Sequence, residues 1–139
     1  MTFEDLDRRF PNGFDDAEIL GINVDYRMRT ATLQLNLRGN SLDSPDRDAY
    51  TRGVLTVRGI YYVSIEPPDY DHLFGPAREK ITVDGLPEDP KDFPLFGSLK
   101  PKLPFGAFCC RFFVHDWNSF IHIGAADAEF SWAPTNPAV

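Results

Sequence analysis

The chain has 139 residues, which is enough for one domain to bury a hydrophobic core without disulfides or metals. It carries 21 acidic and 14 basic residues, a net charge of −7, and it has no basic cluster suited to nucleic-acid phosphates or anionic lipids. No apolar run approaches the ~20 residues of a membrane span, and the acidic first ten residues do not resemble a signal peptide, so we expect a cytoplasmic protein.

The first forty residues predict a short helix followed by a β-hairpin. Thr2 can cap a helix over residues 3–9, which Pro11 would end. Apolar and polar residues then alternate over residues 17–27 and again over 30–38, the pattern typical of two strands. In the first of these strands, the alternation places four residues on one apolar face: Leu20, Ile22, Val24 and Tyr26.

A long third strand is expected over residues 53–66. Gly59 falls in the middle of its apolar face, which predicts a bulge or a sharp bend between two sheets. Eight of the twelve prolines then lie between Pro67 and Pro104, and only residues 80–84 in this region read as a strand. Ordered loops of this length are usually functional, so we interpret the 67–105 segment either as a lid over a sheet or as a protein-recognition surface.

Residues 107–132 predict three further strands almost without interruption. With a turn of two or four residues, His115 is expected opposite Phe120, and Phe113 opposite His122. One face of this hairpin is then entirely apolar and should belong to the core. Its members are Phe108, Cys110, Phe112, Val114, Ile121 and Ile123.

These elements predict a mainly β fold in a single domain spanning residues 1–139. About seven strands joined mostly by short turns, with one short N-terminal helix, indicate an antiparallel sandwich or a strongly curved partial barrel. The only cysteines, Cys109 and Cys110, are neighbours on one strand and point to opposite faces. We therefore expect two buried thiols rather than a redox pair.

An acidic run near the start of the first strand is the first candidate for chemistry. Asp15, Asp16 and Glu18 could bind a divalent cation or act as an acid–base pair. They lack the alternating ligand spacing and central glycine of a calcium loop. On a regular strand, Asp16 and Glu18 share one face while Asp15 takes the other. The favoured interpretation is a solvated strand entrance or a protein contact.

The histidines are the second candidate. His115 and His122 are diagonal neighbours in the expected register and could share a metal with Asp116 or with His72. The set has no defined third ligand, so we expect no metal site and no cofactor. Serines in a nucleophile elbow and glycine-rich phosphate loops are also missing from the sequence. The sequence thus offers no catalytic residue.

Several short segments carry a family resemblance. Phe14–Leu20, Val24–Tyr26 and Thr32–Leu35 resemble the opening of small uncharacterised bacterial β-rich proteins, some of them grouped with immunity proteins of polymorphic toxin systems. Trp117–Ile121 and Ala128–Trp132 fit the same type. The resemblance implies a bacterial cytoplasmic protein without established catalytic residues.

We therefore expect a non-enzymatic protein-interaction module, of the immunity type, that binds a basic partner. At position 15 this chain has aspartate where the family typically has histidine. The expected contact residues are Asp15, Asp16, Glu18, Tyr70, Phe74, Phe93 and Phe96. Two alternatives remain: a small-ligand or metal-binding enzyme that uses His115 and His122 beneath the 67–105 loop, and a structural homodimer paired through a strand edge.

Overall fold

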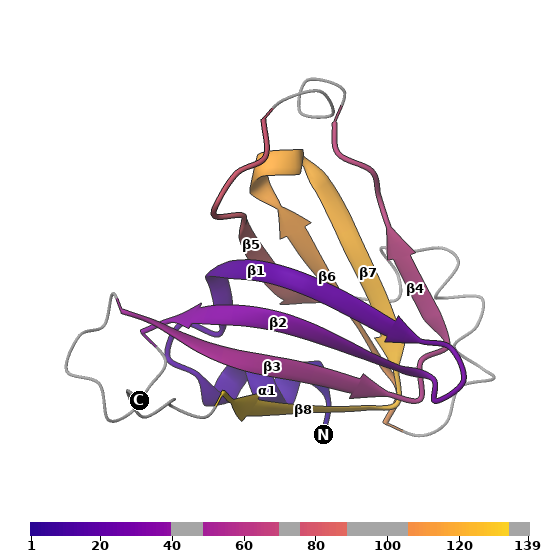
Figure 1. Cartoon of the computed structure of the whole chain (residues 1–139). Coiled ribbons are helices and arrows are strands. Elements are labelled where there is room, and N and C mark those ends of the chain that lie inside the picture. The colour runs from indigo at the N-terminus through magenta and orange to yellow at the C-terminus, as the bar shows by residue number, and fades with distance from the viewer. Residues whose placement is uncertain (40–48, 70–75, 89–105, 134–139) are drawn as a thin grey trace, which may run out of the picture.

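The alternating segments of the sequence form a single antiparallel sheet in the computed structural model, which describes residues 1–39, 49–69, 76–88 and 106–133 (Figure 1). The strands are ordered β4-β7-β6-β5-β1-β2-β3-β8, so the sheet is open. The elements in chain order are α1 (Phe3–Arg9), β1 (Phe14–Asp25), β2 (Thr30–Arg38), β3 (Tyr50–Arg58), β4 (Tyr62–Ile65), β5 (Thr82–Pro87), β6 (Phe108–Val114), the short 3₁₀ helix η3 (His115–Trp117), β7 (Ser119–Ala125) and β8 (Asp127–Trp132). The mainly β prediction is confirmed, with eight strands in the described residues instead of about seven.

The sheet is strongly curved into two halves. In Figure 1, β4, β5, β6 and β7 rise steeply from the layer formed by β1, β2, β3 and β8. Two irregularities in β1 contribute to the bend: its register shifts between Phe14 and Ala17 against β5, and between Ile19 and Gly21 against β2. An extra residue in one strand bends it and increases its twist. The long first strand therefore takes part in both halves.

The chain passes between the two halves at a single corner. Gly59, with a φ of 67°, ends β3 and directs the chain into β4, and Ala126 separates β7 from β8. The backbone N–H of Ala126 donates to the Arg58 carbonyl at 3.0 Å, and the N–H of Tyr61 donates to the Gly124 carbonyl at 3.0 Å. The long strand expected over residues 53–66 is thus two strands. The glycine allows a turn sharp enough to carry the chain to the opposite edge of the same sheet.

The core lies between the sheet and α1. Thr2 caps the helix, as predicted, and it also forms a reciprocal capping box with Asp5. The helix packs against β5, β6 and β8, which belong to both halves. Phe3 stacks on Phe14 with ring centroids 4.7 Å apart and meets Phe112 edge to face at 5.6 Å. This aromatic cluster connects the helix to both halves.

The C-terminal hairpin confirms the predicted core face and corrects the predicted register. All six residues expected on the apolar face are buried. Phe113 pairs with Phe120, and Arg111 pairs with His122, two residues away from the expected pairing. The reason is that η3 and the left-handed Asn118 occupy the connection, so the strands end at Val114 and resume at Ser119. A shift of two residues preserves the faces, because side chains alternate with a period of two.

The predicted apolar face of the first strand is only half right. Ile22 and Val24 pack against the core, but Leu20 is 44% exposed and Tyr26 is 88% exposed. Leu20 is the extra residue of the β1 bulge, so it turns outward and Ile19 takes the inward position opposite Leu35. Because a bulge adds one residue, the residues after it point to the opposite face from the one that a regular alternation predicts. The sequence alternation alone does not reveal where the bulge lies.

Both cysteines are free and buried, as predicted. The Cys110 side chain lies on the core face, and Cys109 lies on the opposite face of β6. Within the described ranges, no helix is long and apolar enough to cross a bilayer.

Candidate functional site

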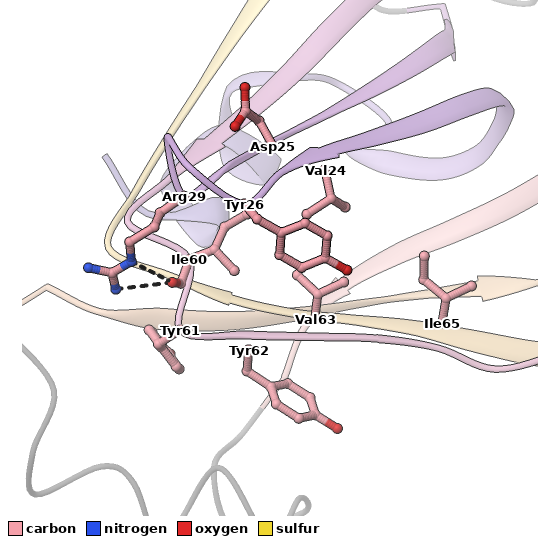
Figure 2. A pocket seen from close by; sticks show the side chains of 9 residues that line it. All are labelled: Val24, Asp25, Tyr26, Arg29, Ile60, Tyr61, Tyr62, Val63 and Ile65. Carbon is pink, nitrogen blue, oxygen red and sulfur yellow. Dashed lines mark hydrogen bonds between the residues drawn. The ribbon is translucent and has the colours of Figure 1, made fainter.

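A groove of about 420 Å³ opens between the tip of the β1–β2 hairpin and the terminal strand β4 (Figure 2). Its lining is largely apolar, from Val24, Tyr26, Ile60, Val63 and Ile65. Figure 2 shows Val63 and Ile65 directed from β4 toward the end of β1, while Tyr62 points away from it. The groove therefore lies between two segments that are far apart in the strand order.

Strand pairing explains why these apolar side chains reach the surface. Val63 pairs with Ile123, and Ile65 pairs with Ile121, so both β4 side chains share the sheet face of two core residues. β4 is the edge strand of the sheet formed by the described residues, and Ile65 is 49% exposed. The apolar face of the sheet thus continues past the closed core into the groove.

Among the described residues, the backbone of β4 is paired on one side only, with β7. The N–H of Glu66 donates to the Phe120 carbonyl at 3.0 Å, which marks this position as a hydrogen-bonded pair of the antiparallel ladder. Because such pairs alternate along a strand, the N–H and C=O groups of Val63 and Ile65 point to the opposite edge. In the part of the chain that the structure describes, no strand pairs with that edge. It presents hydrogen-bonding groups beside an apolar groove.

The opposite wall of the groove is held in place by its own hydrogen bonds. The Asp25 carboxylate accepts from the backbone N–H groups of Arg27 and Met28, each at 3.0 Å. The Arg29 guanidinium donates twice to the Ile60 carbonyl, at 3.2 and 3.0 Å, which connects the hairpin tip to the corner between β3 and β4. Tyr26 is the most exposed large apolar residue described. It lies in a turn that these hydrogen bonds hold in place.

A second cluster lies at the other end of β1 and joins Asp16, Asp84 and His115. One potential ligand atom from each residue lies within 4.8 Å of the other two. His115 Nε2 is 2.5 Å from Asp84 Oδ2, and Asp84 Oδ1 accepts from the Asp16 N–H at 2.7 Å. Asp16 has a φ of 50° and also forms an ion pair with Arg38 at 3.2 Å. Carboxylates and an imidazole in this arrangement can bind protons or a divalent cation.

The predicted acidic contact residues separate in the structure. Asp15 and Asp16 are exposed, but Glu18 is only 8% exposed and accepts a hydrogen bond from Asn36 at 3.1 Å. Glu18 is therefore not available on that surface. The expectation that Asp16 and Glu18 share a face on a regular strand is overturned by the irregularity between Phe14 and Ala17, where Asp16 has a positive φ and the alternation is interrupted. The predicted loop residues Tyr70, His72, Phe74, Phe93 and Phe96 lie outside the described residues.

His115 and His122 do not form the expected pair. His122 Nδ1 lies 3.0 Å from Glu88 Oε2, and the same oxygen accepts from the Cys109 thiol at 3.2 Å. Glu88 is buried, whereas His115 is in contact with Asp84 at the exposed end of the hairpin. Burial, together with the neighbouring Glu88, raises the pKa of the Cys109 thiol, which makes it a poor nucleophile.

Asp84 and the groove were not identified in the sequence. Asp84 ends the predicted strand at residues 80–84, but its partners come from β1 and η3, so its role depends on how these elements come together. The alternation over residues 53–66 places the groove residues of β4 in the interior of a longer strand. The glycine at position 59, read as a sharp turn, was the available signal for a separate edge strand.

Comparison with known proteins found no matching family model, no similar curated protein and no similar solved structure. The resemblance to bacterial immunity proteins therefore stays a prediction.

Proposed function

We propose that this protein is a non-enzymatic interaction module that binds an extended segment of a partner protein along β4. The observation that carries the proposal is the outward backbone edge at Val63 and Ile65 beside an apolar groove. Extended peptides bind exposed sheet edges in this way, since main-chain hydrogen bonds supply affinity and alternate side chains enter pockets.

The groove has the composition that such a segment requires. Every second side chain of an added strand would point to the face that holds Val63 and Ile65, where Val24 and Tyr26 form the far wall. The intervening side chains would point to the other face. A segment with alternating apolar residues thus satisfies both the backbone edge and the groove.

The charge of the chain favours a basic partner. The net charge of −7 attracts cationic proteins during encounter and contributes to selectivity. This is consistent with the immunity-type function that the family resemblance implies. Asp16 lies roughly 25 Å from Val24 along β1, at about 3.3 Å per residue, so the acidic end of β1 and the groove are separate surfaces.

The test compares two substitutions at the same position. Val63→Pro removes the outward N–H without removing a bond to β7, and proline is tolerated at such edge positions. Val63→Thr keeps the N–H and the branched shape. Peptides are selected from a random display library on the wild-type protein, and their affinities are measured by fluorescence anisotropy.

We expect Val63→Pro to weaken peptide binding about tenfold or more, the effect of losing one well-formed backbone hydrogen bond. Val63→Thr should stay within about threefold of the wild type. Ile65→Asp, which places a charge at the groove, should also weaken binding about tenfold or more. Circular dichroism confirms that each variant is folded.

Three results would count against the proposal. The first is that no peptide is selected, and the second is that the selected peptides bind Val63→Pro and Val63→Thr equally. The third is that a small apolar compound binds the groove while peptides do not. Concentration-dependent dimerisation that Val63→Pro abolishes would assign the edge to a second copy of this chain instead.

A further inference from the structure

We propose that Asp16, Asp84 and His115 form a binding site for a divalent transition-metal ion such as Zn²⁺. The inference does not depend on the proposed function, because the cluster lies at the opposite end of β1 from the groove. It rests on the convergence of three side chains from β1, β5 and η3.

The geometry suits one cation. The three ligand atoms lie within 4.8 Å of one another. Zinc binds nitrogen and carboxylate oxygen at about 2.0–2.2 Å, so ligands of one ion are separated by at most about 4.4 Å. Small side-chain rotations of these partly exposed groups would bring all three into contact with a common ion.

The donor atoms indicate the class of metal. One imidazole nitrogen and two carboxylates suit zinc and related transition metals, whereas Mg²⁺ and Ca²⁺ prefer sites made of oxygen ligands alone. His115 Nε2 and Asp84 Oδ2 are 2.5 Å apart. A bound cation would lie between these two atoms and replace the direct contact between them.

Contacts around the cluster hold the ligands in position. The Asp116 carboxylate accepts from the Thr82 N–H at 3.2 Å and pairs with Arg78 at 2.8 Å, which holds η3 and its His115 against β5. The backbone N–H of Asp16 donates to Asp84 Oδ1 and orients that carboxylate. Hydrogen bonds of this kind orient metal ligands in established sites.

Carboxylates and the Arg38 guanidinium surround the cluster, and the carboxylates outnumber the guanidinium. Asp15 adds a further exposed carboxylate next to Asp16 in the sequence. Arg38 pairs with Oδ2 of Asp16, one of the two oxygens of that carboxylate. A divalent cation would reduce the repulsion among these carboxylates.

The test is isothermal titration calorimetry of the full chain with Zn²⁺, after removal of metals by chelation. The variants are His115→Ala and Asp84→Asn, the second of which keeps an oxygen to accept from the Asp16 N–H. Asp127→Asn is the matched control. Asp127 is a partly exposed carboxylate at the start of β8, and it does not belong to the cluster. Nitrogen NMR of the histidine rings shows directly which imidazole binds the ion.

We expect one Zn²⁺ per chain, weakened at least about tenfold in both cluster variants and unchanged in Asp127→Asn. The His115 ring resonances should shift, and those of His122 should not. An excess of Mg²⁺ should compete weakly. The proposal is wrong if no stoichiometric binding occurs, if both cluster variants bind as the wild type does, or if another histidine shifts in place of His115.

Discussion

At the scale of single residues, Asp15 shows how burial and neighbouring charge combine at the acidic end of β1. Burial raises the pKa of Asp15, and the carboxylates of Asp84, Asp7 and Asp16 raise it further. A raised pKa means that the folded chain binds this proton more tightly than the unfolded chain does. Ionised Asp15 therefore disfavours folding above its pKa, and this penalty disappears as the pH falls below the unfolded value.

Asp15→Asn should therefore increase the free energy of unfolding at pH 7 by roughly 0.5 kcal/mol, the scale of exposed charge interactions. At about pH 3, where most aspartates are protonated in both states, the gain should vanish. Urea unfolding at the two pH values measures the difference. Glu79→Gln, at another exposed position, is the control and should show no such gain. An equal gain at both pH values would show that charge is not the cause.

Other carboxylates act in the opposite direction. The N-terminal amine lowers the pKa of Asp127, and Arg58 lowers the pKa of Glu129. Their contribution to stability is present above the unfolded pKa and is lost as the pH falls through the folded one. The free energy of unfolding of the whole chain at low pH contains the contributions of both kinds of carboxylate. The effect of Asp15 alone therefore has to be measured against a matched variant.

At the scale of elements, α1 depends on its cap and its docking. A helix of seven residues is too short to be stable alone in water. Phe3 and Leu6 bury its inner face, and the Thr2–Asp5 capping box satisfies backbone groups at its start. Stability of the helix and stability of the core are therefore coupled.

We expect Thr2→Ala to lower the free energy of unfolding by about 1 kcal/mol, because the cap oxygen is lost. Thr2→Ser keeps that oxygen and should stay within about 0.5 kcal/mol of the wild type. Urea titration followed by circular dichroism compares the three proteins. The capping role is refuted if Thr2→Ser loses as much stability as Thr2→Ala.

At the scale of the whole molecule, the corner at Gly59 and Ala126 determines how the two halves of the sheet are connected. A side-chain carbon at position 59 would lie 2.9 Å from the Ala126 Cβ, and the positive φ of Gly59 is unfavourable for other residues. Both strand connections between the halves pass through this point.

Gly59→Ala should therefore destabilise the fold by about 1–3 kcal/mol through backbone strain and close contact. Gly21→Ala is the control, because nothing lies within 4 Å of an added Cβ there and its φ is not in the left-handed region. It should change stability by less than about 1 kcal/mol. Because one sheet runs through both halves, thermal unfolding should remain a single transition. Equal effects of the two substitutions would exclude the corner as a point of strain.

The sequence by itself determined the local elements of this protein. The Thr2 cap and Pro11 predicted the α1 bounds, and the alternation over residues 30–38 predicted β2 residue for residue. The apolar face of the C-terminal hairpin followed from the same periodicity. Such features depend on neighbours in the chain, so a short window of residues contains the information.

Only the tertiary structure decided which residues meet. Strand order, the bulges of β1 and the two-residue register shift of the last hairpin result from packing between distant segments. The groove needs the end of β1 to face β4 across the curved sheet, and the Asp16–Asp84–His115 cluster needs three elements that are far apart in sequence. Many strand orders are compatible with the same alternation, because alternation specifies which face is buried but not which strands pair.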